Sequence, residues 1–171
     1  DFPELTVQKR TIEFKQVPTV VVVRKPLSKV KSAQGGSKQY FTFLADEGCE
    51  YLKQYLEWRL RNGEELEPDS PIITPDKQYL AGRHIRTTNI GDMMRKPIRD
   101  AGFKSRPYVL RRYFDTRLMM AESDRIIIKD WRVYWMGHKG DIEATYTVQK
   151  GLPPDVVEKM RQAYGEAAEK Y

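Results

Sequence analysis

The chain has 171 residues, enough for one domain with a sizeable core, and its 40% hydrophobic and 32% charged residues are typical of a globular protein. Lysine and arginine total 30 against 24 acidic residues, so the net charge is +6, which favours a polyanionic partner without identifying it. The single cysteine, Cys49, excludes an internal disulfide, and no apolar run approaches membrane-spanning length. We therefore expect a single cytoplasmic domain with no membrane partner.

The sequence as far as Leu44 predicts a small β-sheet. β-Branched and aromatic residues alternate there with turn signals, which predicts strands at about 9–14, 19–24 and 39–44. The intervening segment 28–38 has the composition of a basic, glycine-bearing hairpin loop. We expect the three strands to form one antiparallel sheet ahead of a helical bundle, an α+β fold that is mainly α.

From Asp46 onward, apolar residues recur at helical spacing, which predicts five helices. The first ends at Asn62-Gly63, the second begins near Thr88 or Asn89 with a kink at Pro97, and the third begins at Pro107. The fourth is expected at about 126–136 and should place Trp131 and Trp135 in the core. The fifth spans about 154–169, and its apolar stripe can pack on its own domain or on a neighbouring subunit. Two apolar sets are expected to be buried: Leu110, Phe114 and Leu118 of the third helix, and Val156, Val157, Met160, Ala163, Tyr164 and Ala167 of the fifth.

Two polar segments stand out within these helices. Tyr108, Arg111 and Asp115 share one face of the third helix because they are three and four residues apart. Such a face is usually only solvated. The fourth helix ends at a glycine turn, Met136-Gly137-His138, and Tyr146 follows eight residues after the histidine.

Together these segments resemble the catalytic domain of the tyrosine recombinase, or phage integrase, family. The run 107–116, Pro-Tyr-Val-Leu-Arg-Arg-Tyr-Phe-Asp-Thr, is similar to the family's helix that carries the second catalytic arginine. Met136-Gly137-His138 and Ala144-Thr145-Tyr146 resemble the family's leucine-glycine-histidine turn and nucleophilic tyrosine. The stretches 40–44 and 83–91 look most similar to archaeal integrases, so the resemblance covers nearly the whole chain.

The resemblance implies a DNA breaking and rejoining enzyme that needs no metal or nucleotide cofactor. Tyr146 would attack a DNA phosphate and form a 3′-phosphotyrosyl link, while Arg111 would donate two hydrogen bonds to the phosphate and favour the phenolate. His138 would bind the same phosphate or assist proton movement. A hairpin lysine would protonate the departing 5′ hydroxyl. Lys29 is the best match for it, and Lys31 and Lys38 are alternatives.

The sequence departs from the family's pattern at two catalytic positions. Tyr108 occupies the first position of the histidine-x-x-arginine motif, where it can donate a hydrogen bond but is a weaker proton acceptor. The family's first catalytic arginine has no match in the chain, and we expect it to precede Asp1. The 171 residues are then a C-terminal catalytic domain that lacks its first arginine helix and any separate core-binding domain, and they would be inactive alone.

Three other functions remain open on the sequence alone. The chain can be a noncatalytic DNA-binding module on the same scaffold, a type IB topoisomerase-like enzyme, or an unrelated basic helical protein that binds RNA. For the recombinase, the expected partner is a double-stranded DNA attachment site on which a homotetramer assembles, with no small-molecule substrate. His84, beside Arg83 and Arg86, is expected at the surface or against a phosphate.

Overall fold

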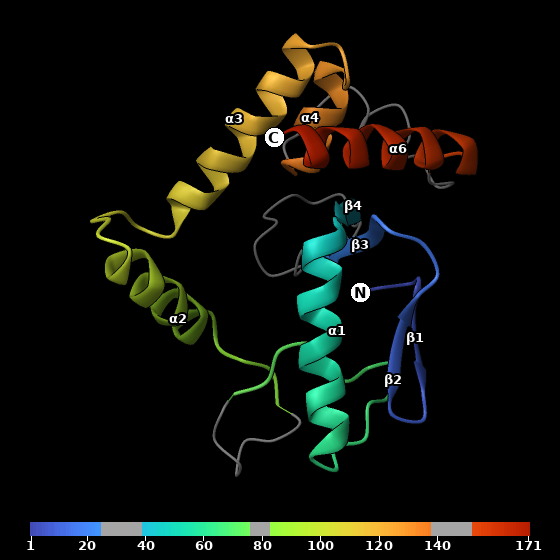
Figure 1. Ribbon diagram of the computed structural model, residues 1–171, viewed down its shortest axis with the longest axis vertical. Coiled ribbons are helices and arrows are strands. Elements are labelled where there is room, and N and C mark those ends of the chain that lie inside the picture. The colour runs from blue at the N-terminus through green and yellow to red at the C-terminus, as the bar shows by residue number, and fades with distance from the viewer. Residues whose placement is uncertain (25–38, 76–82, 138–151) are drawn as a thin grey trace, which may run out of the picture.

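The computed structural model describes residues 1–24, 39–75, 83–137 and 152–171, and it is a mainly helical α+β fold (Figure 1). Four strands come first and five helices follow within these ranges. The strands are β1 (Leu5–Gln8), β2 (Thr11–Phe14), β3 (Thr19–Arg24) and β4 (Gln39–Leu44). The helices are α1 (Asp46–Arg61), α2 (Thr87–Asp100), α3 (Tyr108–Ser123), α4 (Lys129–Trp135) and α6 (Pro154–Lys170).

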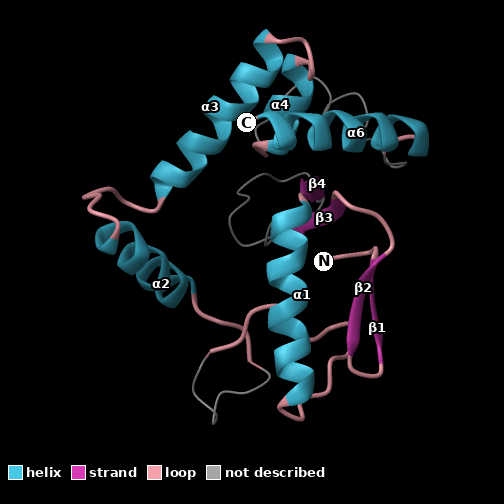
Figure 2. Ribbon diagram, in the orientation of Figure 1, coloured by secondary structure: helices cyan, strands magenta, loops and turns pink. Residues whose placement is uncertain are grey.

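The expectation of one three-stranded sheet is wrong. The strands form two separate two-stranded antiparallel sheets, β1 with β2 and β3 with β4 (Figure 2). The segment predicted as a single strand at 9–14 contains a turn at Lys9, whose φ of 52° reverses the chain so that Leu5 pairs with Phe14 and Gln8 with Thr11. The two later strands have the predicted bounds and pair from Thr19 with Leu44 to Arg24 with Gln39.

The outer edge of β3 has no room for a third strand, because the start of the chain already occupies its hydrogen-bonding groups. The Val22 N–H donates to the carbonyl of Asp1 at 2.9 Å, and the Asp1 amino group donates to the Val22 carbonyl at 2.8 Å. The Val20 N–H donates to Oε2 of Glu4 at 2.9 Å. A strand can add to an edge only through free donors and acceptors, so β2 is kept from pairing with β3.

The two sheets also belong to different hydrophobic clusters. Ile12 of β2 packs with Leu56 and Leu60 of α1. The larger cluster forms where β3 and β4 meet α3, α4 and α6, and Phe43 lies in it against the rings of Trp135 and Tyr164. Because their apolar faces are buried against different helices, the two hairpins do not form a continuous sheet.

Helix α6 packs on its own domain. Its expected stripe, Val156, Val157, Met160, Ala163, Tyr164 and Ala167, lies in or against the larger cluster, and Met160 is 0% exposed. On the same helix the buried Arg161 donates to Glu4, with Nη2 to Oε1 at 2.6 Å and Nη1 to Oε2 at 2.9 Å, and also to the carbonyl of Pro18. The stripe is therefore packed, in whole or in part, against its own domain.

Helix α3 is only half covered by the rest of the protein. Leu118 is 4% exposed and Phe114 packs against the larger cluster, as expected. Leu110, however, is 45% exposed, so its predicted burial is wrong. In Figure 1 the first turns of α3 extend beyond α4 and α6 toward α2.

Helices α4 and α2 differ in how they are held. Helix α4 starts three residues later than predicted, because Ile128 is still extended, and it buries Trp135 as expected while Trp131 packs against the cluster. Helix α2 contains Pro97 without ending there, buries none of its side chains and lies apart from the other helices (Figure 1). None of the helices within the described ranges is long and apolar enough to cross a membrane.

Candidate functional site

The polar face of α3 lies beside the carboxyl end of α4. Tyr108, in the first turn, is 65% exposed. One turn further, Nη2 of Arg111 donates a hydrogen bond to the backbone carbonyl of Met136. Asp115, one more turn along, accepts a hydrogen bond from Nη1 of Arg132 at 2.9 Å. The three residues expected on one face therefore follow each other along the same side of the helix, and two of them contact the segment around α4.

The bond from Arg111 to Met136 joins two motifs that are 25 residues apart in the chain. Helix α4 ends at Trp135, the Gly137 N–H donates to the carbonyl of Tyr134 at 2.8 Å, and Gly137 has a φ of 64°. A positive φ is easy for glycine, which explains why a glycine ends this helix. Met136, where the turn that leads into His138 begins, is therefore hydrogen-bonded to the guanidinium of Arg111.

Three of the five predicted catalytic residues, Lys29, His138 and Tyr146, lie outside the described residues, as do the alternatives Lys31 and Lys38. Of the two described ones, Arg111 lies at the α4 turn and Tyr108 is exposed at the start of the same helix. The remaining basic residue with a predicted surface role, His84, is exposed together with Arg83 and Arg86.

Arg132 and Glu122 were not predicted as part of this site. Nε of Arg132 donates to Oε2 of Glu122 at 2.7 Å, and its Nη1 donates to Asp115, so one guanidinium joins two carboxylates of α3. Burial alone lowers the pKa of Arg132, but the hydrogen bonds to Asp115 and Glu122 outweigh it and leave the pKa raised. No sequence signal identifies this contact, because the residues are 10 and 17 positions apart and no helical repeat relates them.

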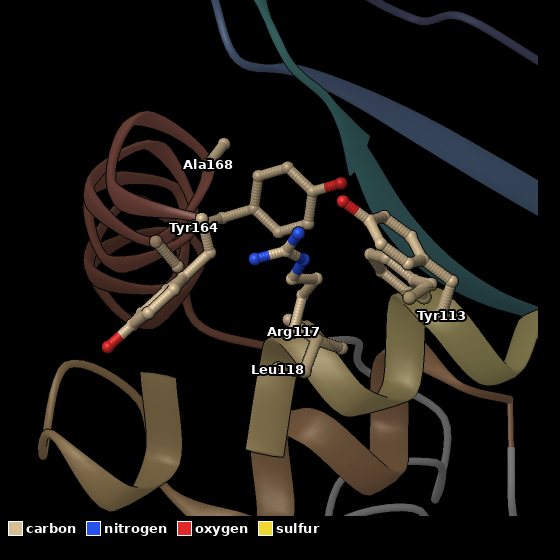
Figure 3. Close-up of a pocket in the computed structure, with 8 residues that line it drawn as sticks. Tyr113, Arg117, Leu118, Tyr164 and Ala168 are labelled. Carbon is tan, nitrogen blue, oxygen red and sulfur yellow. The ribbon is translucent and has the colours of Figure 1, made fainter. Parts of the chain in front are cut away.

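A small apolar pocket lies between α3 and α6 and has a volume of about 180 Å³. Figure 3 shows the Arg117 side chain between Tyr113 and Tyr164, and the guanidinium carbon lies 4.7 Å from the centre of the Tyr113 ring. Burial raises the pKa of Tyr164 to about 12. Because a tyrosine must lose its proton to attack phosphorus, Tyr164 is poorly suited to be a nucleophile.

The described residues contain no group of three or more histidine, cysteine, aspartate or glutamate side chains that could hold a metal ion. Cys49 is buried, and burial raises the pKa of its thiol, so it is a poor thiolate nucleophile. In the described part of the site, the guanidinium of Arg111 and the phenol of Tyr108 are groups that can bind an anion by hydrogen bonds.

Comparison with known proteins finds no matching protein family, no matching curated protein and no matching solved structure.

Proposed function

We propose that this chain is the catalytic domain of a site-specific DNA recombinase, or integrase, that cuts and rejoins DNA through a covalent 3′-phosphotyrosyl intermediate. Tyr146 is the nucleophile, Arg111 and His138 bind the reacting phosphate, Tyr108 donates a further hydrogen bond to it, and Lys29 protonates the 5′ hydroxyl that leaves. The new bond joins the Tyr146 oxygen to phosphorus as the bond to the 5′ oxygen breaks. Rejoining reverses the exchange, so bond energy is retained without a cofactor.

One observation carries this proposal. Arg111 donates to the Met136 carbonyl, so the arginine helix and the turn that precedes His138 are neighbours in space although they are distant in sequence. A shared phosphate site requires this proximity, because an arginine fork and a histidine must reach the same nonbridging oxygens at hydrogen-bond distance. An accidental likeness of two short motifs would not require the two segments to meet.

The charge of the chain supports a DNA partner. The net charge is +6. Exposed arginine side chains include Arg83 and Arg86, just before α2, and Arg112 on α3. Contacts of this kind bind phosphates without regard to sequence, and they make affinity strongly dependent on salt. Assembly of a homotetramer on a double-stranded attachment site belongs to the same proposal, since strand exchange between two duplexes needs four cuts.

The test is the covalent adduct itself. The full gene product is mixed with a pool of nicked duplexes tiled across the DNA that flanks its gene, and SDS-resistant protein–DNA species are measured. We expect an adduct with the wild-type protein and none with Tyr146→Phe, because the phenolic oxygen is the attacking atom. Tyr51→Phe, which removes the hydroxyl of an exposed tyrosine on α1, is the matched control and should keep the adduct.

A second candidate function is a DNA-binding module without catalysis. It is favoured by Tyr108, which replaces a histidine and is 65% exposed at the start of α3, the helix that also carries the exposed Arg112. In that case both tyrosine variants would bind DNA as the wild type does, and no duplex in the pool would give an adduct. Tight binding without an adduct would therefore replace the recombinase proposal by this one.

A further inference from the structure

Arg132 connects α4 to α3 at a point close to the candidate catalytic arginine. Its side chain is only 20% exposed and is bound by Asp115 at 2.9 Å and by Glu122 at 2.7 Å. Both contacts are ion pairs between the two helices, and α3 packs directly against α4. Both ion pairs of the Arg132 side chain therefore reach a different helix, unlike the i,i+4 pairs that many surface arginines make within one helix.

The contact of Arg132 with Asp115 is a neighbour of the contact of Arg111 with Met136. Asp115 lies four residues after Arg111 on α3, and Arg132 lies four residues before Met136, whose N–H donates to the Arg132 carbonyl at 3.1 Å. The two links are thus about one helical turn apart, both along α3 and along α4 with its end at Met136. A rotation or shift of α4 that breaks the first link would also displace the second.

The length of α4 makes such links necessary. It has seven residues, and an isolated helix of that length is not stable in water, so its orientation depends on tertiary contacts. Trp135 buries one side of α4 in the larger cluster. Apolar packing is not directional, whereas a guanidinium held by two carboxylates restricts both rotation and sliding.

We propose that Arg132 is a positioning residue that, through Asp115 and Glu122, holds the carboxyl end of α4 and the turn leading to His138 against Arg111. This inference rests on the proposed function. Arg132 does not touch the phosphate. It keeps Arg111 beside Met136, where the turn before His138 begins, and its loss lowers the rate of the chemical step more than the affinity for DNA.

The kinetic test uses the full gene product and the nicked duplex that yields an adduct. At saturating DNA we expect Arg132→Ala to slow adduct formation on the order of 10–100-fold, with the DNA dissociation constant changed less than about threefold. Arg132→Lys should recover part of the rate, because an ammonium can still pair with one carboxylate. The control Arg95→Ala removes the exposed ion pair between Arg95 and Asp92 of α2 and should leave the rate unchanged.

A double-mutant cycle separates positioning from a general loss of stability. Asp115→Asn and Glu122→Gln should each slow adduct formation, and neither should slow it further when Arg132 is already alanine. All measurements are made at a temperature where circular dichroism finds every variant folded. Losses that multiply in the double variants, or an Arg132→Ala protein with the wild-type rate, would overturn the inference.

A measurement without DNA keeps this inference separate from the proposed function. Amide hydrogen exchange of Met136 and Gly137 reports whether the end of α4 is held, and we expect it to accelerate about tenfold in Arg132→Ala. The amides of Asn62 and Gly63 at the end of α1 make the same kind of turn bonds and should not change. If the wild type forms no adduct, the recombinase proposal fails. If the exchange of Met136 and Gly137 is unaltered, the role of Arg132 is contradicted whatever the enzyme does.

Discussion

Buried arginine side chains connect segments of this fold that are separate in sequence. Arg59 of α1 is one of them. Its side chain is 1% exposed. Nε and Nη2 donate to the two carboxylate oxygens of Glu64 at 2.7 and 2.5 Å, and Nη1 donates to the carbonyls of Pro71 and Ile72 at 2.7 and 2.9 Å. One side chain therefore satisfies four acceptors and fastens the segment after α1 to the helix.

Arg59→Met should lower the free energy of unfolding by roughly 3–5 kcal/mol, because a buried charge pair loses one partner and two carbonyls lose their donor. Urea denaturation of both proteins at pH 7 measures this. Arg61→Met changes an exposed arginine two residues away and is expected to stay within about 0.5 kcal/mol of the wild type. Equal losses in the two variants would contradict the role given to the Arg59 contacts.

At the scale of elements, α2 differs from the other long helices. It buries no side chain, and Ile90, Met93 and Met94 are more than a third exposed. By contrast α1 buries Leu56 and Leu60, and α6 buries Met160. A helix of 14 residues that contains a glycine and a proline has little stability of its own, so its stability depends on packing against the rest of the protein.

We expect the amides of α2 to exchange with solvent much faster than those of α1 and α6, by about a hundredfold or more, because opening α2 breaks few apolar contacts. Hydrogen exchange followed by mass spectrometry on the protein without DNA is the measurement, with α1 and α6 as internal controls. Protection of α2 as strong as that of α1 would mean that its apolar face is covered in solution.

Element boundaries could be predicted where the pattern is local. The strands at 19–24 and 39–44 and the helix at 46–61 have the expected bounds, because residue type and periodicity act within a few positions. The predictions were wrong where a turn or a contact with a distant segment determines the structure. Lys9 takes a positive φ that its residue type does not predict, and Leu110 is 45% exposed because none of the helices in the described ranges buries it.

At the scale of the whole molecule, Glu4 and Arg161 tie the start of the chain to α6, 157 residues later. Burial by itself raises the pKa of Glu4, but hydrogen bonds from Arg161, Val20 and Thr19 outweigh it and leave the pKa lowered. A carboxylate whose pKa is lowered by folding contributes stability above its unfolded pKa of about 4.3, and loses that contribution as the pH falls through the folded value.

The wild-type protein should consequently lose stability between about pH 5 and pH 3, and Glu4→Gln should be less stable at pH 7 with a flatter slope in that range. Urea midpoints at several pH values test this. Glu50→Gln, which alters an exposed carboxylate of α1, should keep the wild-type slope. The same acid slope in Glu4→Gln and the wild type would show that this ion pair does not govern the acid response.

In the candidate site, as for the element boundaries, the features that depend on local sequence could be predicted and those that depend on distant contacts could not. The shared face of Tyr108, Arg111 and Asp115 and the glycine turn before His138 were predictable, because both depend on spacing along one helix or on one residue type. The contact of Arg111 with Met136 and the pairing of Arg132 with Asp115 and Glu122 were not. They require α3 and α4 to pack at a particular rotation, which no single helix specifies.

The sequence alone determined the order and type of most elements, the face that carries Arg111, and the basic charge, since these follow from residue types and short repeats. Tertiary structure alone decided that the strands form two sheets, that α6 is buried in its own domain, and that Arg132 joins α4 to α3. The physical reason is the range of the interactions. The hydrogen bonds that Asp1 donates to Val22, Val20 donates to Glu4 and Arg161 donates to Glu4 form only after distant segments have packed together.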